Sequence, residues 1–92
     1  MISKGPKKGT IRFSLTPQIG VRTVQVAGDF NDWNPQPMRK QKSGQYVAIC
    51  PVNGTGSEYK FLVDGDWAVD PDNNCWARNP FGTVNSVVQL ED

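Results

Sequence analysis

Two tryptophans in this sequence occupy positions where a protein core has little use for them. Trp33 follows Asp-Phe-Asn-Asp and precedes Asn-Pro, so a turn is expected to hold its ring at the tip of a loop. Trp67 comes shortly after the tight-turn pair Asp64-Gly65. The run that contains it is short, and alternation does not decide which face of the sheet carries its side chain. Because a small domain loses core area when it exposes tryptophan, both rings call for a functional explanation.

Two polar residues are expected near these rings, on the outward faces of strands. Strict alternation places Tyr59 and Phe61 toward the core, which leaves Lys60 pointing outward. Taken alone, Lys60 would be interpreted as a lysine kept on a sheet face for solubility. In the last apolar run the apolar residues share one parity, so Asn85, on the other parity, should also project outward.

This combination of side chains suits a neutral ligand that carries many hydroxyl groups. The face of an indole can cover the apolar C–H face of a sugar ring. An ammonium and an amide supply donors and an acceptor for the hydroxyls. We therefore expect sugar binding, which needs no catalytic carboxylate.

A group of aspartates raises the alternatives of catalysis and metal binding. Four aspartates could form a glycosidase pair or a calcium site: Asp64, Asp66, Asp70 and Asp72. A calcium loop starting at the first or the third of them puts an unsuitable residue at both the glycine and the glutamate positions. The aspartates are expected to be ordinary turn residues beside glycine and proline. We therefore expect no enzyme, no metal and no cofactor.

Length, charge and hydropathy limit the classes of protein to which this chain can belong. A length of 92 residues suits one domain, and a net charge of +1 with scattered basic residues does not suggest nucleic-acid binding. The basic residues 4–8 belong to a segment, 1–8, that is expected to be a flexible tail before a module at 9–92. No apolar stretch is long enough for a signal peptide or a membrane span, so a cytoplasmic protein is expected.

Cysteine and histidine usage agrees with that expectation. The chain has two cysteines, Cys50 and Cys75, without CxxC spacing, and no histidine. Zinc, haem and histidine-based catalysis therefore lose their usual ligands and bases. Cys50 lies in an apolar run and is expected to be a small buried hydrophobe, although one disulfide stays open as an alternative.

The elements that must position these residues are all strands. Glycine and proline separate short alternating runs, and no window keeps a helical period. Strands are predicted at residues 11–15, 24–28, 45–51, 58–63, 67–70 and 84–90. The pairs Asn53-Gly54 and Asp64-Gly65 predict tight hairpins. Residues 70–81 are expected to be a long loop, in which Trp76 anchors the sandwich edge outside the site.

Three ordered motifs carry a family resemblance. They are Val-Ala-Gly-Asp-Phe-Asn-Asp-Trp at 26–33, Tyr-Lys-Phe-Leu-Val-Asp-Gly-Asp-Trp-Ala-Val-Asp-Pro at 59–71 and Gly-Thr-Val-Asn-Ser at 82–86. With them, residues 9–91 resemble carbohydrate-binding module family 48. That family includes the glycogen-binding domain of the AMP-activated protein kinase beta subunit and modules of branching and debranching enzymes. The resemblance implies an early-set, immunoglobulin-like antiparallel β-sandwich.

The resemblance also implies a site for α-1,4-linked glucose chains. By position in the motifs, Trp33 and Trp67 would stack on glucose rings, and Lys60 and Asn85 would hydrogen-bond to hydroxyls. Phe81 stands where kinase-type members have a leucine that threads a curved or cyclic glucan. A phenyl ring there should still give apolar contact.

The expected function is therefore non-catalytic binding of glycogen, starch, maltooligosaccharides or cyclodextrin, for targeting or sensing. The chain would act alone or as a piece of a longer protein. The alternative is a protein-interaction module whose aromatic surface contacts a kinase or an amylolytic enzyme. Nucleic-acid and membrane partners are not expected.

Overall fold

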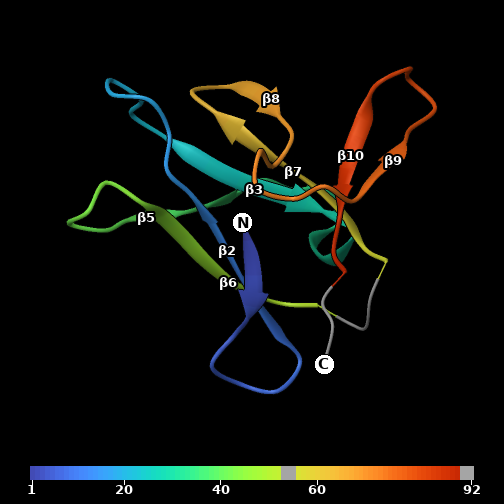
Figure 1. Cartoon of the computed structure of the whole chain (residues 1–92), viewed down its shortest axis with the longest axis horizontal. Helices are drawn as coiled ribbons and strands as arrows, with labels where there is room; N and C mark the ends of the chain where they lie inside the picture. Colours follow the sequence, from blue (N-terminus) through green and yellow to red (C-terminus); the bar gives the residue numbers. More distant parts are fainter. Residues whose placement is uncertain (53–55, 90–92) are drawn as a thin grey trace.

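The computed structural model describes residues 1–52 and 56–89, which form two antiparallel sheets packed around one core (Figure 1). In order across the first sheet, the strands are β1 (Ile2–Lys4), β2 (Thr10–Leu15), β6 (Tyr46–Pro51) and β5 (Arg39–Lys40). The second sheet runs β4 (Gln36–Pro37), β3 (Val24–Gly28), β7 (Glu58–Val63), β10 (Val84–Val87) and β9 (Trp76–Arg78), and β8 (Asp66–Ala68) also pairs with β7. The all-β fold predicted from the sequence is confirmed.

The core lies between the sheets and is built by residues of alternating parity. Phe13 of β2 and Tyr59 of β7 are both fully buried, and their ring centroids lie 5.0 Å apart. Phe30, just after β3, also stacks on Phe13, with the ring centroids 5.0 Å apart. Each large side chain buried in this way contributes about 1.5–3 kcal/mol, so this cluster is a main source of stability.

Strand β7 determines which residues face away from the core. Tyr59 and Phe61 point inward as predicted, and Lys60 and Leu62 point outward. The register pairs Ser86 of β10 with Tyr59, so the residues that neighbour this pair along both strands lie on the outer face. The candidate site is therefore expected on the outer face of the second sheet.

The predicted hairpin at Asp64-Gly65 is confirmed. Val63 pairs with Asp66, which leaves Asp64 and Gly65 as a two-residue loop with φ angles of 48° and 88°. Two positive φ angles are the signature of a type I′ turn, which matches the twist of the flanking strands. The turn places β8 directly beside β7.

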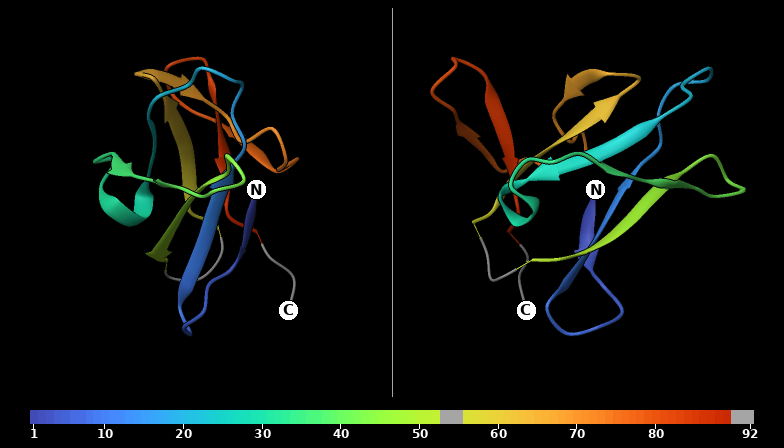
Figure 2. Two further views of the ribbon diagram at one scale, coloured as in Figure 1. Left: turned by 90° about the vertical axis from the view of Figure 1, so that its left-hand side faces the viewer. Right: turned by 180° about the vertical axis from the view of Figure 1, so that it is seen from behind.

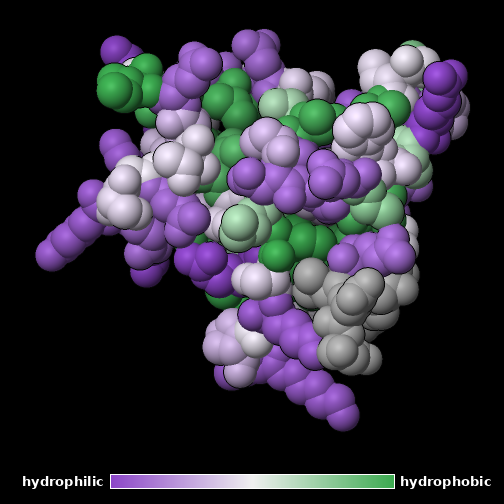
Figure 3. All heavy atoms as spheres, viewed as in Figure 1, coloured by the Kyte–Doolittle hydropathy of each residue, from purple (hydrophilic) through white to green (hydrophobic). Residues whose placement is uncertain are grey.

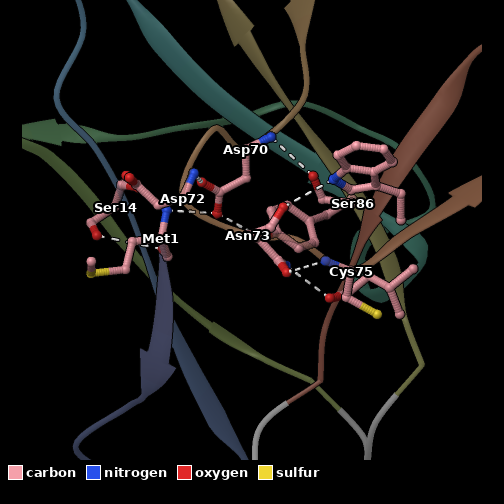
Figure 4. Close-up of polar contacts among 10 residues, drawn as sticks. Met1, Ser14, Asp70, Asp72, Asn73, Cys75 and Ser86 are labelled. Atoms are coloured by element: carbon pink, nitrogen blue, oxygen red, sulfur yellow. Dashed lines mark hydrogen bonds and ion pairs between the residues drawn. The ribbon is translucent and has the colours of Figure 1, made fainter.

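Asp70, expected to be an ordinary turn residue, is instead the centre of a buried polar cluster (Figure 4). It is 1% exposed, and its Oδ2 accepts a hydrogen bond from the Tyr59 hydroxyl at 2.7 Å. The same oxygen lies 2.6 Å from the ammonium of Met1, and Oδ1 accepts from the Asp72 N–H. The Asp70 N–H donates to the Ser86 hydroxyl. This carboxylate therefore holds the two sheets together.

Burial and the charge of Asp70 also act on the tyrosine of this cluster. Burial raises the pKa of Tyr59 far above its usual value, and the neighbouring carboxylate raises it further. The hydroxyl consequently stays protonated and keeps donating to Asp70 at every ordinary pH.

The segment expected to be a flexible tail, residues 1–8, differs in the structure. Its residues Ile2–Lys4 form β1, in which Ile2 pairs with Phe13 of β2. In the loop that connects β1 to β2, Lys7 and Lys8 are exposed. Figure 3 shows hydrophilic side chains extending from this loop at the bottom of the view.

The expected long loop at 70–81 also differs, because it contains strand β9. Both cysteines are free thiols, and Cys50 is buried as predicted. The Asn53-Gly54 turn and residue Leu90 lie outside the described residues. No helix in the described part of the chain is long and apolar enough to cross a membrane.

Candidate functional site

Trp33 is held by a tight turn that follows β3. The chain makes one turn of 3₁₀ helix, η1 (Asp29–Asn31), and then Asp32 and Trp33 take positive φ angles of 55° and 60°. The Trp33 N–H closes this turn on the Gly28 carbonyl at 2.9 Å. This conformation turns the indole back toward the outer face of the second sheet, where it is half-buried.

Trp67 reaches the same face from the β7–β8 hairpin. It pairs with Leu62, an outward residue of β7, so the register decides the face that the sequence left open. Its side chain is 51% exposed. The ring centroids of Trp33 and Trp67 lie 6.2 Å apart, with the ring planes inclined by 65°. The two indoles therefore form one continuous aromatic surface.

Lys60 projects from β7 on this face. Its Nζ donates to the Thr83 hydroxyl at 3.1 Å, which directs the ammonium toward the start of β10. An ammonium carries three donors, so this hydrogen bond leaves others for a ligand.

Asn85 faces the same region from β10 but is only 7% exposed, less than an outward position suggested. Its Nδ2 donates to Glu58 Oε1 at 3.0 Å, and its Oδ1 accepts from Asn79 Nδ2 at 3.1 Å. Asn79 also donates to the Thr83 hydroxyl at 2.6 Å. The amide is thus fixed in orientation by its neighbours rather than open to solvent.

A hollow of about 670 Å³ lies between these side chains. Figure 2 shows the segments that surround it, namely η1, β8 and the β9–β10 hairpin, arranged around β7. Its lining comprises Asp29, Trp33, Glu58, Lys60, Trp67, Arg78, Asn79, Pro80, Phe81, Thr83 and Asn85. A hollow of this size, with an aromatic wall and a polar wall, can hold part of an oligosaccharide.

The charges of the hollow balance. Lys60 and Arg78 oppose Asp29 and Glu58. Both carboxylates are already engaged by protein donors, because Asp29 accepts from two N–H groups and Glu58 from the amide of Asn85. A balanced surface of this kind suits an uncharged ligand better than an anion or a cation.

Comparison with known proteins identifies the family. The sequence profile described as the glycogen recognition site of AMP-activated protein kinase matches residues 11–92. The chain belongs to this family. As a member of the glycogen recognition family, it has the sandwich that its strand pattern predicted, and the family resemblance inferred from the motifs is confirmed.

Two proteins with similar sequences are named as kinase subunits. 5'-AMP-activated protein kinase subunit beta-1 of Sus scrofa is 35% identical over 72 residues, which cover 78% of this chain and 57% of that sequence. The Homo sapiens subunit beta-1 is 33% identical over 72 residues, 78% of this chain and 26% of its own length. The chain thus spans from about half to about a quarter of the length of these relatives.

A solved structure supports the fold. A Salmonella typhimurium protein, described as a candidate alpha amylase, superposes with a TM-score of 0.73 at 21% identity. The match covers 94% of this chain and 14% of that chain. The likeness agrees with an immunoglobulin-like sandwich.

The structure brings all five sequence-predicted site residues of this family member to one hollow. They are Trp33, Lys60, Trp67, Phe81 and Asn85. Phe81, at the tip of the β9–β10 hairpin, is 89% exposed. Trp76, expected outside the site, does not line the hollow: its ring is 62% exposed and its Nε1 donates to the Asn73 carbonyl.

Sequence reasoning missed other residues of the hollow. Asp29 and Asn79 are of residue types that are common in turns, and Glu58 comes just before the motif at 59–71. Asp29 could have been found, because it stands four residues before Trp33 in a segment predicted to turn. Nothing in the spacing indicated that Asn79 would support both Thr83 and Asn85.

Proposed function

We propose that this glycogen recognition domain binds α-1,4-linked glucan in the hollow and performs no chemistry on it. The observation that carries the proposal is the aromatic surface of Trp33 and Trp67 facing the donors of Lys60 and Asn85. The indoles would stack on the C–H faces of glucose units. The ammonium would hydrogen-bond to their hydroxyls, and the Asn85 amide would add the Nδ2 hydrogen that Glu58 does not use.

The inclination of the rings favours a curved glucan. At 65° to each other, the two indole planes suit successive sugar units that are themselves rotated. α-1,4 linkage curves a glucose chain and rotates its units in this way, whereas β-1,4 linkage keeps the chain straight and flat. Phe81, exposed at the rim of the hollow, would add apolar contact to a ring further along the chain.

The carboxylates of the hollow support binding rather than hydrolysis. Asp29 accepts a hydrogen bond on each carboxylate oxygen and Glu58 accepts one on Oε1, so the protein uses both groups as acceptors rather than as acids. The purified chain should accordingly release no reducing ends from amylose. Steady release that an acidic-residue substitution in the hollow abolishes would contradict this part of the proposal.

The biological role that follows is targeting or sensing of storage polysaccharide. Few exposed stacking and hydroxyl contacts, set against ordering costs, leave micromolar to millimolar affinity, about −4 to −8 kcal/mol. Affinity of this order suits reversible attachment of a larger protein to a polymer that offers many sites.

A titration tests the proposal. Maltoheptaose and β-cyclodextrin should change the tryptophan fluorescence of the folded domain with saturation below several millimolar, and cellohexaose should not. If no α-glucan changes the signal at several millimolar, or if cellohexaose binds as tightly, the proposed ligand is wrong. Calorimetry on the same samples would exclude a silent binding event.

A second candidate is contact with a protein partner, favoured by the exposure of two apolar side chains that line the hollow, Phe81 at 89% and Trp67 at 51%. The relatives named as kinase subunits make a kinase one partner to test, and an amylolytic enzyme another. Substitution of Trp67 by alanine should then weaken the protein complex. Loss of sugar binding with an intact complex would favour the glucan instead.

A further inference from the structure

Two N–H donors from different segments converge on the carboxylate of Asp29. The Trp33 ring donates from Nε1 to Oδ1 at 3.0 Å, and the Glu58 backbone N–H donates to Oδ2 at 2.8 Å. Trp33 belongs to the turn after β3, and Glu58 is the first residue of β7. Asp29 therefore ties the turn that carries an indole of the hollow to the strand that carries Lys60.

We propose that Asp29 is a positioning residue: it holds the Trp33 indole in the orientation that stacks on sugar, without contacting the sugar itself. This inference rests on the proposed function, since it assumes that Trp33 meets the ligand. It adds a residue that was not among the expected binding residues.

The backbone around Trp33 needs such support. Asp32 and Trp33 take consecutive left-handed φ angles of 55° and 60°, a conformation that few residues other than glycine adopt readily. Trp33 is only half-buried, so packing fixes part of its ring and leaves the rest open. A charge-assisted hydrogen bond to Nε1 supplies the missing constraint on the ring.

The chemistry of the contact requires a carboxylate. Two donors need two acceptors, and an ionised aspartate presents one oxygen to each. An asparagine of the same shape offers a single acceptor, so its NH₂ group would face either the Trp33 ring N–H or the Glu58 N–H. One of the two hydrogen bonds must then break.

The same contact gives the two indoles different roles. The only donor of the Trp33 ring is used by Asp29, so this ring can recognise a sugar by its face alone. The Trp67 Nε1 makes no hydrogen bond to any described residue and can donate to a hydroxyl. Trp33 would thus be a fixed platform, and Trp67 a ring that both stacks and donates.

Hydrogen exchange of the indole N–H groups tests the positioning in the free protein. The Trp33 proton, bonded to Asp29, and the Trp76 proton, bonded to the Asn73 carbonyl, should exchange several-fold more slowly than that of Trp67. Nuclear magnetic resonance of ¹⁵N-labelled protein resolves the three signals. Exchange of Trp33 as fast as that of Trp67 would overturn the proposal without any substitution.

Substitution tests the consequence for binding. Asp29→Asn should weaken maltoheptaose binding about tenfold and speed the exchange of the Trp33 indole proton. Asp32→Asn is the matched control: it removes the same charge in the same turn, suits a left-handed φ, and should change affinity less than about twofold. Equal affinity of Asp29→Asn and the wild type would contradict the proposal.

A double-substitution cycle separates positioning from general damage. Trp33→Phe keeps an aromatic face and removes the ring N–H, so Asp29→Asn added to it should cost less than about threefold. A full tenfold cost in that background would show that Asp29 acts through something other than the indole. Trp33→Ala reports on the proposed function: if it leaves binding intact the glucan site is wrong, whereas intact binding in Asp29→Asn alone refutes only the positioning role.

Discussion

Neighbouring residues on β7 and β10 serve two polar clusters on opposite faces of one sheet. Tyr59 and Ser86 point inward to Asp70, whereas Lys60 and Asn85, one residue away, point outward to the hollow. The inward cluster is closed, with each polar group satisfied by the protein. The outward cluster keeps donors of Lys60 in reserve.

Residues that stabilise the fold and residues that would recognise a ligand are therefore adjacent along the same two strands. A closed buried cluster gains from every member and loses heavily when one is removed, because the remaining donors cannot reach water. An exposed contact such as the hydrogen bond of Lys60 to Thr83 costs little to disturb, since water replaces the lost partner. Substitutions on the two faces should therefore have opposite profiles, and the following experiments test that comparison.

The largest effect is expected at Asp70. Asp70→Ala removes a carboxylate that is 1% exposed and leaves the Tyr59 hydroxyl and the Asp72 N–H without their acceptor. We expect unfolding in urea to show a loss of about 3 kcal/mol. At low temperature, where the variant is still folded, glucan affinity should be unchanged. A loss below about 0.5 kcal/mol would mean that the inward cluster is not a structural centre.

Binding should respond most to Trp67. Trp67→Ala removes half of the aromatic surface and should weaken maltoheptaose binding more than about tenfold, with less than about 1 kcal/mol lost in stability. Trp76→Ala is the matched control, because Trp76 is also an exposed tryptophan, at 62%, but lies outside the hollow. Similar losses of affinity in both variants would indicate that the effect is not specific to the hollow.

A smaller effect is expected at Lys60. Lys60→Met keeps the aliphatic stem and removes the ammonium that donates to Thr83, so affinity should fall about three- to tenfold. The free energy of unfolding, measured by thermal denaturation, should change by no more than about 0.5 kcal/mol, since the lost contact is exposed. Lys40→Met on β5 of the other sheet removes the same charge and should leave affinity unchanged. A marked loss of stability in Lys60→Met would show that this lysine supports the fold, as Asp70 does, rather than ligand binding.

The smallest effect concerns pH and the β7–β8 turn. The backbone N–H groups of Thr23 and Arg22 hold the pKa of Asp64 below its usual value. A lowered folded pKa means that the carboxylate stabilises the fold above its unfolded pKa, near 4, and loses this effect as pH falls through the folded value. Wild type should therefore melt above Asp64→Asn at pH 6, with the gap closing toward pH 2.5.

Asp66→Asn provides the control for that titration, since it removes the same charge from the same hairpin without touching those amides. Its melting temperature should follow the wild type in parallel across the pH range. A gap that closes equally in both variants would assign the effect to net charge rather than to the turn.

Much of the fold followed from alternation and turn chemistry. The runs on β2, β3, β6, β7 and β10 alternate clearly, and Asp64-Gly65 determined the hairpin register. Strands β1 and β9 were missed because each has three residues at a sheet edge, too few to show a period. Each pairs with the strand that follows it along the chain, but the connecting loops carry no Asn-Gly or Asp-Gly pair that would have indicated a hairpin.

The sequence also predicted the site only in part. Alternation assigns Asn85 a face but not the cover that Glu58 and Asn79 place over it, because this cover depends on β7, β10 and the β9–β10 loop meeting. Asp29 lies in a segment predicted to turn, but the sequence does not show that its carboxylate reaches both an indole and a strand. Residue type and parity predict which side chains gather, and tertiary contact decides how each is held.

Nuclear magnetic resonance of the indole groups during a maltoheptaose titration tests the central claim most directly. The account predicts that the Trp33 and Trp67 signals shift together along one saturating curve while the Trp76 signal stays in place. Shifts confined to Trp76, or no shift at several millimolar sugar in the folded protein, would contradict it.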